Sequence, residues 1–313
     1  MAAIVAIAFN TFREAVRDRV LYSMLLFAVG LILFALVLGR IAPQEQERLT
    51  VDVGLATISI MTVLLAIILG GTNLYKEIER KTVYFLLPHP LARWQVLVGK
   101  YVGMLWVLLV TLAVTGGTLL TVMAWHDRQM QSWVLTAATA DVAIAITLLI
   151  ALRRFPHVWP TVLALWMVGS GVTLATLSQA NVAVLFQGLG LVLAEASVVT
   201  ALALLFSSFS TPFLSGLLTF MVFVAGRQLE WLETLAERID HAGGERLLAV
   251  VSAVFPNCYL FVPSVNVLEG RLVIAGAPMA PWELVGHAMS YGFLYAAITL
   301  GIAGLVLWRR DFV

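Results

Sequence analysis

The chain has few charged residues, and this shortage restricts its class. Charged residues make up 12% of its 313 residues, whereas a soluble domain carries about 25%. Hydrophobic residues make up 61% of the chain, and the mean hydropathy is +0.96. This composition predicts an all-α, polytopic helical membrane protein.

Cysteine, clustered charge and paired histidines are also scarce. The single cysteine, Cys258, excludes an intrachain disulfide bond and a metal site built from several cysteines. The five histidines show no metal-ligand spacing and no Ser-His-Asp arrangement, so we expect no catalytic residue, metal site or cofactor in this chain. The net charge is +1, with basic residues spread along the chain, which predicts no nucleic-acid partner.

Apolar runs long enough to cross a bilayer recur along the sequence. A hydrocarbon core of about 30 Å requires roughly 17–25 apolar residues per helix. The hairpin 133–178 is either an extra peripheral pair of spans or partly re-entrant, because Asp141 and two prolines interrupt it. The predicted spans are 20–42, 53–75, 99–124, 133–152, 157–178, 183–206, 212–227 and 284–308.

The distribution of basic residues predicts the orientation of these spans. All the lysines, together with arginines near both ends of the chain, fall on one side of the predicted topology. Because lysine and arginine collect in cytoplasmic loops, we expect both termini in the cytoplasm and residues 228–283 on the outer face, Cys258 included.

The N-terminal segment 1–19 is predicted to be an interfacial helix. Val5, Phe9, Phe12 and Val16 recur at helical spacing, opposite a face that carries arginines. Such an amphipathic helix lies in the plane of the membrane surface. The alternative is that these residues are the frayed start of the first span.

Residues 76–98 form a charged and then apolar segment between two spans. Its charges, clustered within one or two helical turns, exclude it from the bilayer interior. Its apolar run is too long for a solvent-exposed loop that binds nothing. We therefore expect the segment to dock on a partner protein or to lie on the membrane surface as a topological hinge. The docking residues would be Glu77, Glu79, Arg80, Lys81, Tyr84, Phe85, Leu86, Pro90 and Arg93.

Two acidic residues lie deep inside predicted spans. Asp141 and Glu195 are near the middle of their runs, whereas the lysines and arginines of the predicted spans lie only at span ends, so we expect no basic residue to pair with the two acids. An aspartate at the bilayer centre costs about 2.5–3.5 kcal/mol on insertion scales. We expect either a proton relay or substrate contact, or a protonated carboxyl bonded locally, to Ser197 or Thr200 in the case of Glu195.

The segment 228–283 is polar and contains two amphipathic stretches separated by a Gly-Gly break. In the first stretch, Leu232, Leu235 and Ile239 share one face. An apolar stripe must be buried against something. We expect it either to cover the outer end of a transport pathway and act as a gate, or to lie on the outer membrane interface without a gating role.

Several motifs together resemble one family. They are NTFREAVRDRVLY at residues 10–22, the ExERKT segment with its following Pro90, Arg93 and Gly99-Lys100, the corner SSFSTPF at residues 207–213, and the terminal Arg309-Arg310-Asp311-Phe312. In this order they resemble the permease subunits of ABC-2-type transporters, in particular the branch that includes the permease of the nitrous-oxide reductase maturation system. That family usually has about six spans, whereas the apolar runs of this chain number about eight, so we expect about 6–8 transmembrane helices, with residues 133–178 as the additional pair.

The resemblance implies one transmembrane permease domain over residues 1–313, in a bacterial inner membrane. It implies a homodimer surrounded by lipid and two copies of a separate ATPase, which binds ATP and magnesium. The chain has no GxxxxGK[ST] loop, since Tyr101 follows Gly99-Lys100. Residues 76–98 would then be the coupling helix of an exporter. Two alternatives stay open: an ion-coupled secondary transporter that uses Asp141 and Glu195, and a non-transporting membrane anchor. The sequence does not identify the substrate.

Overall fold

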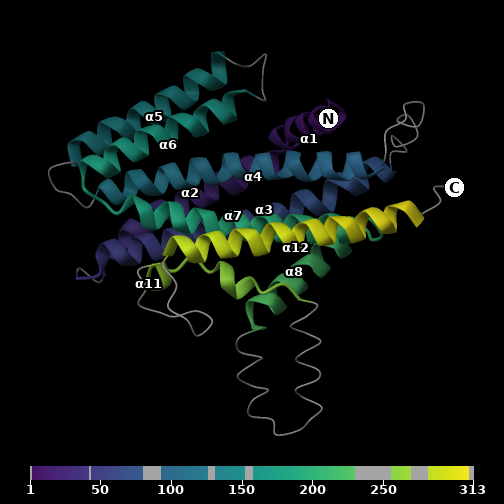
Figure 1. The fold of residues 1–313 in the computed structure, drawn as a ribbon. Coiled ribbons are helices and arrows are strands. Elements are labelled where there is room, and N and C mark those ends of the chain that lie inside the picture. The colour runs from purple at the N-terminus through teal and green to yellow at the C-terminus, as the bar shows by residue number, and fades with distance from the viewer. Residues whose placement is uncertain are drawn as a thin grey trace, which may run out of the picture.

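The protein is a bundle of long helices. The computed structural model describes residues 2–41, 44–79, 93–125, 131–151, 158–229, 255–268 and 281–309. Within these ranges there is no strand, which confirms the predicted all-α fold. Figure 1 shows the long helices lying side by side. The elements are α1 (Ala2–Val16), α2 (Arg19–Gly39), α3 (Gln46–Glu79), α4 (Arg93–Ala124), α5 (Gln131–Ala151), α6 (Trp159–Leu177), α7 (Val182–Ser207), α8 (Pro212–Arg227), η2 (Cys258–Phe261), α11 (Val265–Leu268) and α12 (Pro281–Arg309).

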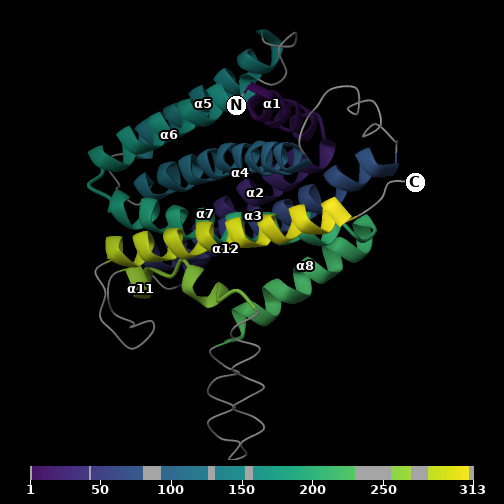
Figure 2. The ribbon, with the colours of Figure 1, turned by 45° about the vertical axis from the view of Figure 1, so that its right-hand side comes forward.

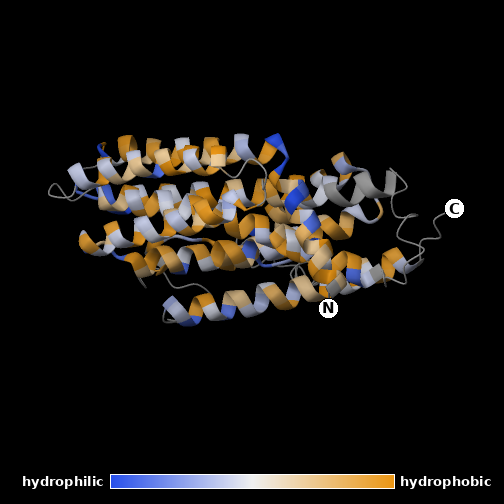
Figure 3. Ribbon diagram, turned by 90° about the horizontal axis from the view of Figure 1, so that it is seen from above, coloured by the Kyte–Doolittle hydropathy of each residue, from blue (hydrophilic) through white to orange (hydrophobic). Residues whose placement is uncertain are grey.

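Seven of the described helices are long and apolar enough to cross a membrane, namely α2 to α7 and α12. Their apolar residues continue on the outside of the bundle, as in the exposed Phe27 and Phe34 of α2 and Leu294 and Ile298 of α12. Figure 3 shows hydrophobic positions along the whole length of the helices. A bundle that is apolar on its outside is stable in lipid, so the prediction of a polytopic membrane protein is confirmed.

Helix α1 packs across the first turns of α4. Glycines of α4 allow the close approach, because a Cβ atom at Gly103 would lie 2.5 Å from the carbonyl oxygen of Ala8. Phe12 and Val16 are buried, whereas Val5 is 66% exposed. The buried face therefore runs through Ala8, Phe12 and Ala15, about one residue round from the predicted stripe.

Helix α7 occupies the centre of the bundle and is buried along most of its length. It packs against α3, α4, α8 and α12. Helix α12 runs parallel to α7, since Gly190 approaches Val285 near the start of both helices and Ala194 approaches Gly292 further along. The chain must therefore return to the starting end of α7 between residues 207 and 281.

That return path is split into two pieces. Helix α8 has 16 residues, or about 24 Å of helix, and runs antiparallel to α7 only as far as its middle. The Ser215 hydroxyl donates to the carbonyl oxygen of Ala203, and Arg227 meets Glu195. The predicted span 212–227 thus has the right bounds, but it is shorter than a full crossing of about 30 Å.

Residues 255–268 cover the other half of α7. The backbone N–H of Val265 donates to Asp52 Oδ1 near the start of α3 at 2.7 Å, and Cys258 and Phe261 have no exposed surface. A Cβ atom at Gly226 would collide with the carbonyl oxygen of Pro256, so the end of α8 abuts this segment. Non-helical backbone at membrane depth is tolerated when protein buries it, as here. Figures 1 and 2 both show α8 leaving the bundle obliquely.

Helices α5 and α6 form an antiparallel pair at the edge of the bundle (Figure 1). Helix α6 docks on α4 through a close glycine crossing, where a Cβ atom at Gly171 would lie 2.8 Å from the carbonyl oxygen of Gly117. Helix α5 packs on α6 and only lightly on α4. The pair is therefore attached to the rest of the protein mainly through one helix face.

The glycine crossing leads to a prediction about stability. Replacing Gly171 by leucine should lower the free energy of unfolding by about 1–3 kcal/mol, because the new side chain has no room against α4. Gly169 on the same helix has no atom within 4 Å of an added Cβ and is the matched control. Thermal unfolding in detergent measures both variants. Equal losses at the two positions would contradict the crossing.

Candidate functional site

A polar cluster lies at the centre of this apolar bundle, around Glu195 in the middle of α7. The Glu195 side chain has no exposed surface. Ser59 of α3 donates its hydroxyl to Oε2 at 2.6 Å, and Nη1 of Arg227 at the end of α8 donates to Oε1. Three elements far apart in sequence therefore meet at one carboxylate.

The prediction that Glu195 has no basic partner is wrong. Arg227 is the last residue of α8 and reaches the carboxylate of Glu195 in the middle of α7. The predicted local partners are also wrong, since the hydroxyls of Ser197 and Thr200 donate to the backbone of their own helix, to Ala194 and Ala196. The available signal was the length of α8, which is too short to carry Arg227 across a bilayer.

The surroundings of Arg227 hold it at this place. Its guanidinium lies 5.8 Å from the centre of the Phe223 ring, one turn earlier on α8. The Arg227 side chain is 25% exposed, while Glu195 is fully enclosed. A buried carboxylate is strongly destabilising unless it is paired and hydrogen-bonded, and here both conditions are met. The pair therefore fixes where α8 ends.

Asp141 has a different partner and a different place. It is 7% exposed and accepts a hydrogen bond of 2.8 Å from Nε1 of Trp166, so it joins α5 to α6. Because α5 packs mainly on α6 and lightly on α4, Asp141 does not share a site with Glu195. A relay that uses both acids has no geometric support in the described residues.

The predicted docking residues fall largely outside the described part of the chain. Glu77 and Glu79 lie in the last turn of α3, and Arg93 begins α4. These two helix ends lie at the same end of the bundle as the end of α12 (Figure 1). Arg80, Lys81, Tyr84, Phe85, Leu86 and Pro90 lie outside the described residues, as do the predicted gate residues Leu232, Leu235 and Ile239.

Among the described residues, no group of three or more histidine, cysteine, aspartate or glutamate side chains is placed to hold a metal ion. Cys258 is buried, so the single thiol is inaccessible in this structure. The polar cluster around Glu195 is thus a set of hydrogen bonds and one ion pair.

The family of the chain is identified by comparison with known proteins. No curated protein matches the chain. A family model described as "ABC-2 family transporter protein" matches residues 5–226, which is more than half of the chain and includes α1 to α8 almost entirely. The chain therefore belongs to the ABC-2 family of transporter proteins.

Proposed function

We propose that this chain, as the permease subunit of an ABC transporter, exports its substrate and is driven by a separate ATPase subunit. The family assignment carries this proposal. The absence of a phosphate-binding loop from the sequence fits a division of labour in which the partner binds ATP and magnesium. The assembly would contain two permease copies and two ATPase copies in a bacterial inner membrane.

The ATPase would dock at residues 76–98. This segment joins the end of α3 to the start of α4, and it carries charges followed by aromatic and aliphatic residues. Charged residues orient a protein partner and apolar residues supply binding free energy when they fill its groove. With this end of the bundle in the cytoplasm, both termini are cytoplasmic too, and residues 232–239 would form the outer gate.

The resemblance to the permease of the nitrous-oxide reductase maturation system remains part of this proposal. The motifs behind this resemblance lie at residues 10–22, 77–100, 207–213 and 309–312. Which substrate the chain exports would then depend on residues outside those motifs.

Reconstitution with an ATPase encoded beside this chain tests the function. We expect the two proteins to purify together and the ATPase activity to rise severalfold when the permease is present in liposomes. Liposomes that carry an ion gradient but no ATPase are the control. Transport driven by that gradient alone would overturn the proposal in favour of an ion-coupled transporter, and absence of any complex with the ATPase would favour a membrane anchor.

A further inference from the structure

A cavity of about 470 Å³ lies at the end of the bundle where α3 begins, away from the polar cluster around Glu195. It is formed by the first turns of α3 and α7, the last turn of α4, the turn after α6, and α11. The cavity falls within the range of about 300–1,000 Å³ that small-molecule sites occupy. The lining residues are Gln44, Glu45, Glu47, Arg48, Val51, Met123, Gln179, Asn181, Val184 and Val265.

The cavity has an apolar floor and a polar rim. Val51, Met123, Val184 and Val265 form the floor, and each of them is buried. The amides and carboxylates of the rim are exposed, among them Glu47 and Asn181. A ligand that fits this distribution has an aliphatic part for the floor and a polar head for the rim.

Charge at the rim decides the sign of that head. Two helices begin at the cavity, α3 and α7, and two end there, α4 and α6, so their terminal partial charges oppose one another. Arg48 is neutralised by Glu45, with Nη1 3.4 Å from Oε2. Among the described residues Glu47 has neither an ion-pair nor a hydrogen-bond partner, so the rim keeps one net negative charge.

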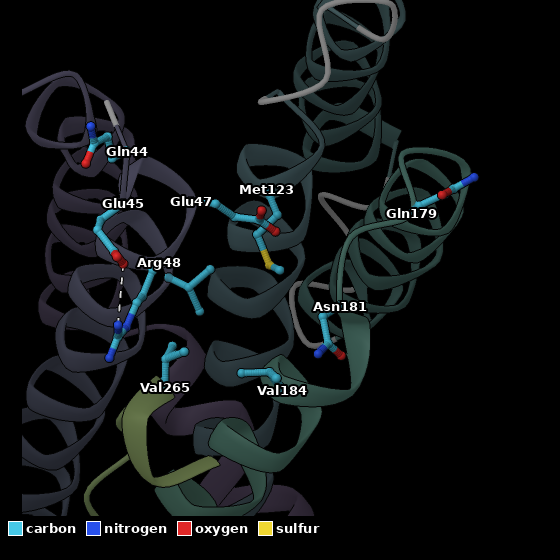
Figure 4. A pocket seen from close by; sticks show the side chains of 10 residues that line it. Gln44, Glu45, Glu47, Arg48, Met123, Gln179, Asn181, Val184 and Val265 are labelled. Atoms are coloured by element: carbon cyan, nitrogen blue, oxygen red, sulfur yellow. Dashed lines mark hydrogen bonds and ion pairs between the residues drawn. The ribbon is translucent and has the colours of Figure 1, made fainter. Parts of the chain in front are cut away.

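Figure 4 shows how these side chains are directed. The Glu45–Arg48 pair lies at the edge of the cavity, with the two side chains facing each other. Glu47 instead extends from α3 over the cavity toward Met123. The unpaired carboxylate is therefore the one that a bound ligand would meet, directly above the apolar floor.

We propose that this cavity binds a primary ammonium group carried on a short aliphatic chain, with Glu47 as its counter-ion. An ammonium supplies three hydrogen-bond donors, and the rim offers acceptors on Glu47, Gln44 and Asn181. Quaternary ammonium ligands are recognised by aromatic cages, and no aromatic residue lines the cavity in the part of the chain that the structure describes. The same head occurs on water-soluble amines and on aminophospholipids, and the cavity lies at the end of membrane-spanning helices where either is available.

Calorimetric titration of the purified full-length chain in a non-ionic detergent tests the proposal. Three probes with the same six-carbon stem are compared: hexylammonium, hexanoate and hexanol. We expect hexylammonium to bind at least tenfold more tightly than the other two. Equal affinities for all three would show that the cavity takes only the stem, and this result would overturn the assignment of Glu47.

Variants locate the binding. Glu47→Gln keeps the shape of the side chain and should weaken hexylammonium at least tenfold, while Glu283→Gln, in the first turn of α12, should not change it. Asn181→Trp should block the cavity, since Asn181 makes no capping hydrogen bond that the change would remove. Wild-type affinity in Glu47→Gln would reject the site, whatever the other variants do.

Nanodiscs identify the source of the amine. Discs of phosphatidylglycerol alone are compared with discs in which half the lipid is phosphatidylethanolamine. A severalfold weaker apparent affinity for hexylammonium in the second discs, absent from Glu47→Gln, assigns the site to the lipid headgroup. Unchanged affinity assigns it to a water-soluble amine.

Discussion

Replacing Arg227 by glutamine is expected to destabilise the bundle by about 3–5 kcal/mol, the range found when one partner of a buried ion pair is removed. The reason is the environment of Glu195, which has no exposed surface and keeps only the Ser59 hydroxyl as a partner after the change. The negative charge of the carboxylate would then be buried without a positively charged partner. Thermal or denaturant unfolding of the purified chain in detergent measures the loss.

A double variant separates the cost of an unpaired buried charge from the loss of the two side chains themselves. In Glu195→Gln with Arg227→Gln no charge remains buried, so most of the lost stability should return. Arg40→Gln, at the exposed cap of α2, is the matched control for losing one arginine. If Arg227→Gln were no less stable than Arg40→Gln, or if the double variant were as unstable as the single one, the pair would not hold α8 in place.

Charge reversal in the proposed coupling segment should abolish ATPase stimulation. The variant combines Glu79→Lys, Arg80→Glu and Phe85→Ala, three positions that lie between the candidate spans Gln46–Thr72 and Trp94–Ala124. Its charges would orient the ATPase and its aromatic ring would fill the partner's groove, so both contributions are lost together. Stimulated ATP hydrolysis in liposomes is the measurement, and membrane insertion should stay intact.

The matched control reverses one acidic and one basic residue and removes one aromatic ring at the opposite end of the bundle. It combines Glu283→Lys, Arg40→Glu and Trp282→Ala, all of them exposed residues. This control should keep the stimulation. Unchanged ATPase binding and activity in the Glu79–Arg80–Phe85 variant would remove the coupling role from residues 76–98 and leave them as a hinge at the membrane surface.

Most of the fold could be predicted from the sequence because membrane spans depend on local composition. The bounds of α7 and α8, for example, lie within a few residues of the predicted runs 183–206 and 212–227. The partners of buried polar groups could not be predicted in the same way. Ser59 and Arg227 are 136 and 32 residues away from Glu195, and no periodicity within α7 refers to them. The cavity at Glu47 likewise combines residues from five separate segments.

The face of α1 shows a second limit. Of the apolar residues at helical spacing, Phe12 and Val16 are buried against the bundle, whereas Val5 and Phe9 are exposed, and the spacing alone does not distinguish the two sets. The buried face is instead set by the small residues that α1 and α4 present to one another, Ala8 against Gly103 among them. Hydropathy ranks alanine and glycine below phenylalanine and valine, although close helix packing in membranes prefers the small residues.

The Asp141–Trp166 hydrogen bond has a consequence for how the protein is assembled in the membrane. Its two partners are 25 residues apart on neighbouring helices, so the α5–α6 pair satisfies its own buried carboxylate as soon as both helices have inserted. Glu195 cannot form its ion pair this early, because Arg227 is synthesised 32 residues later. We therefore expect the carboxylate of Glu195 in α7 to lack its ion-pair partner after insertion until α8 docks. The packing at the centre of the bundle would then form after the α5–α6 pair at its edge.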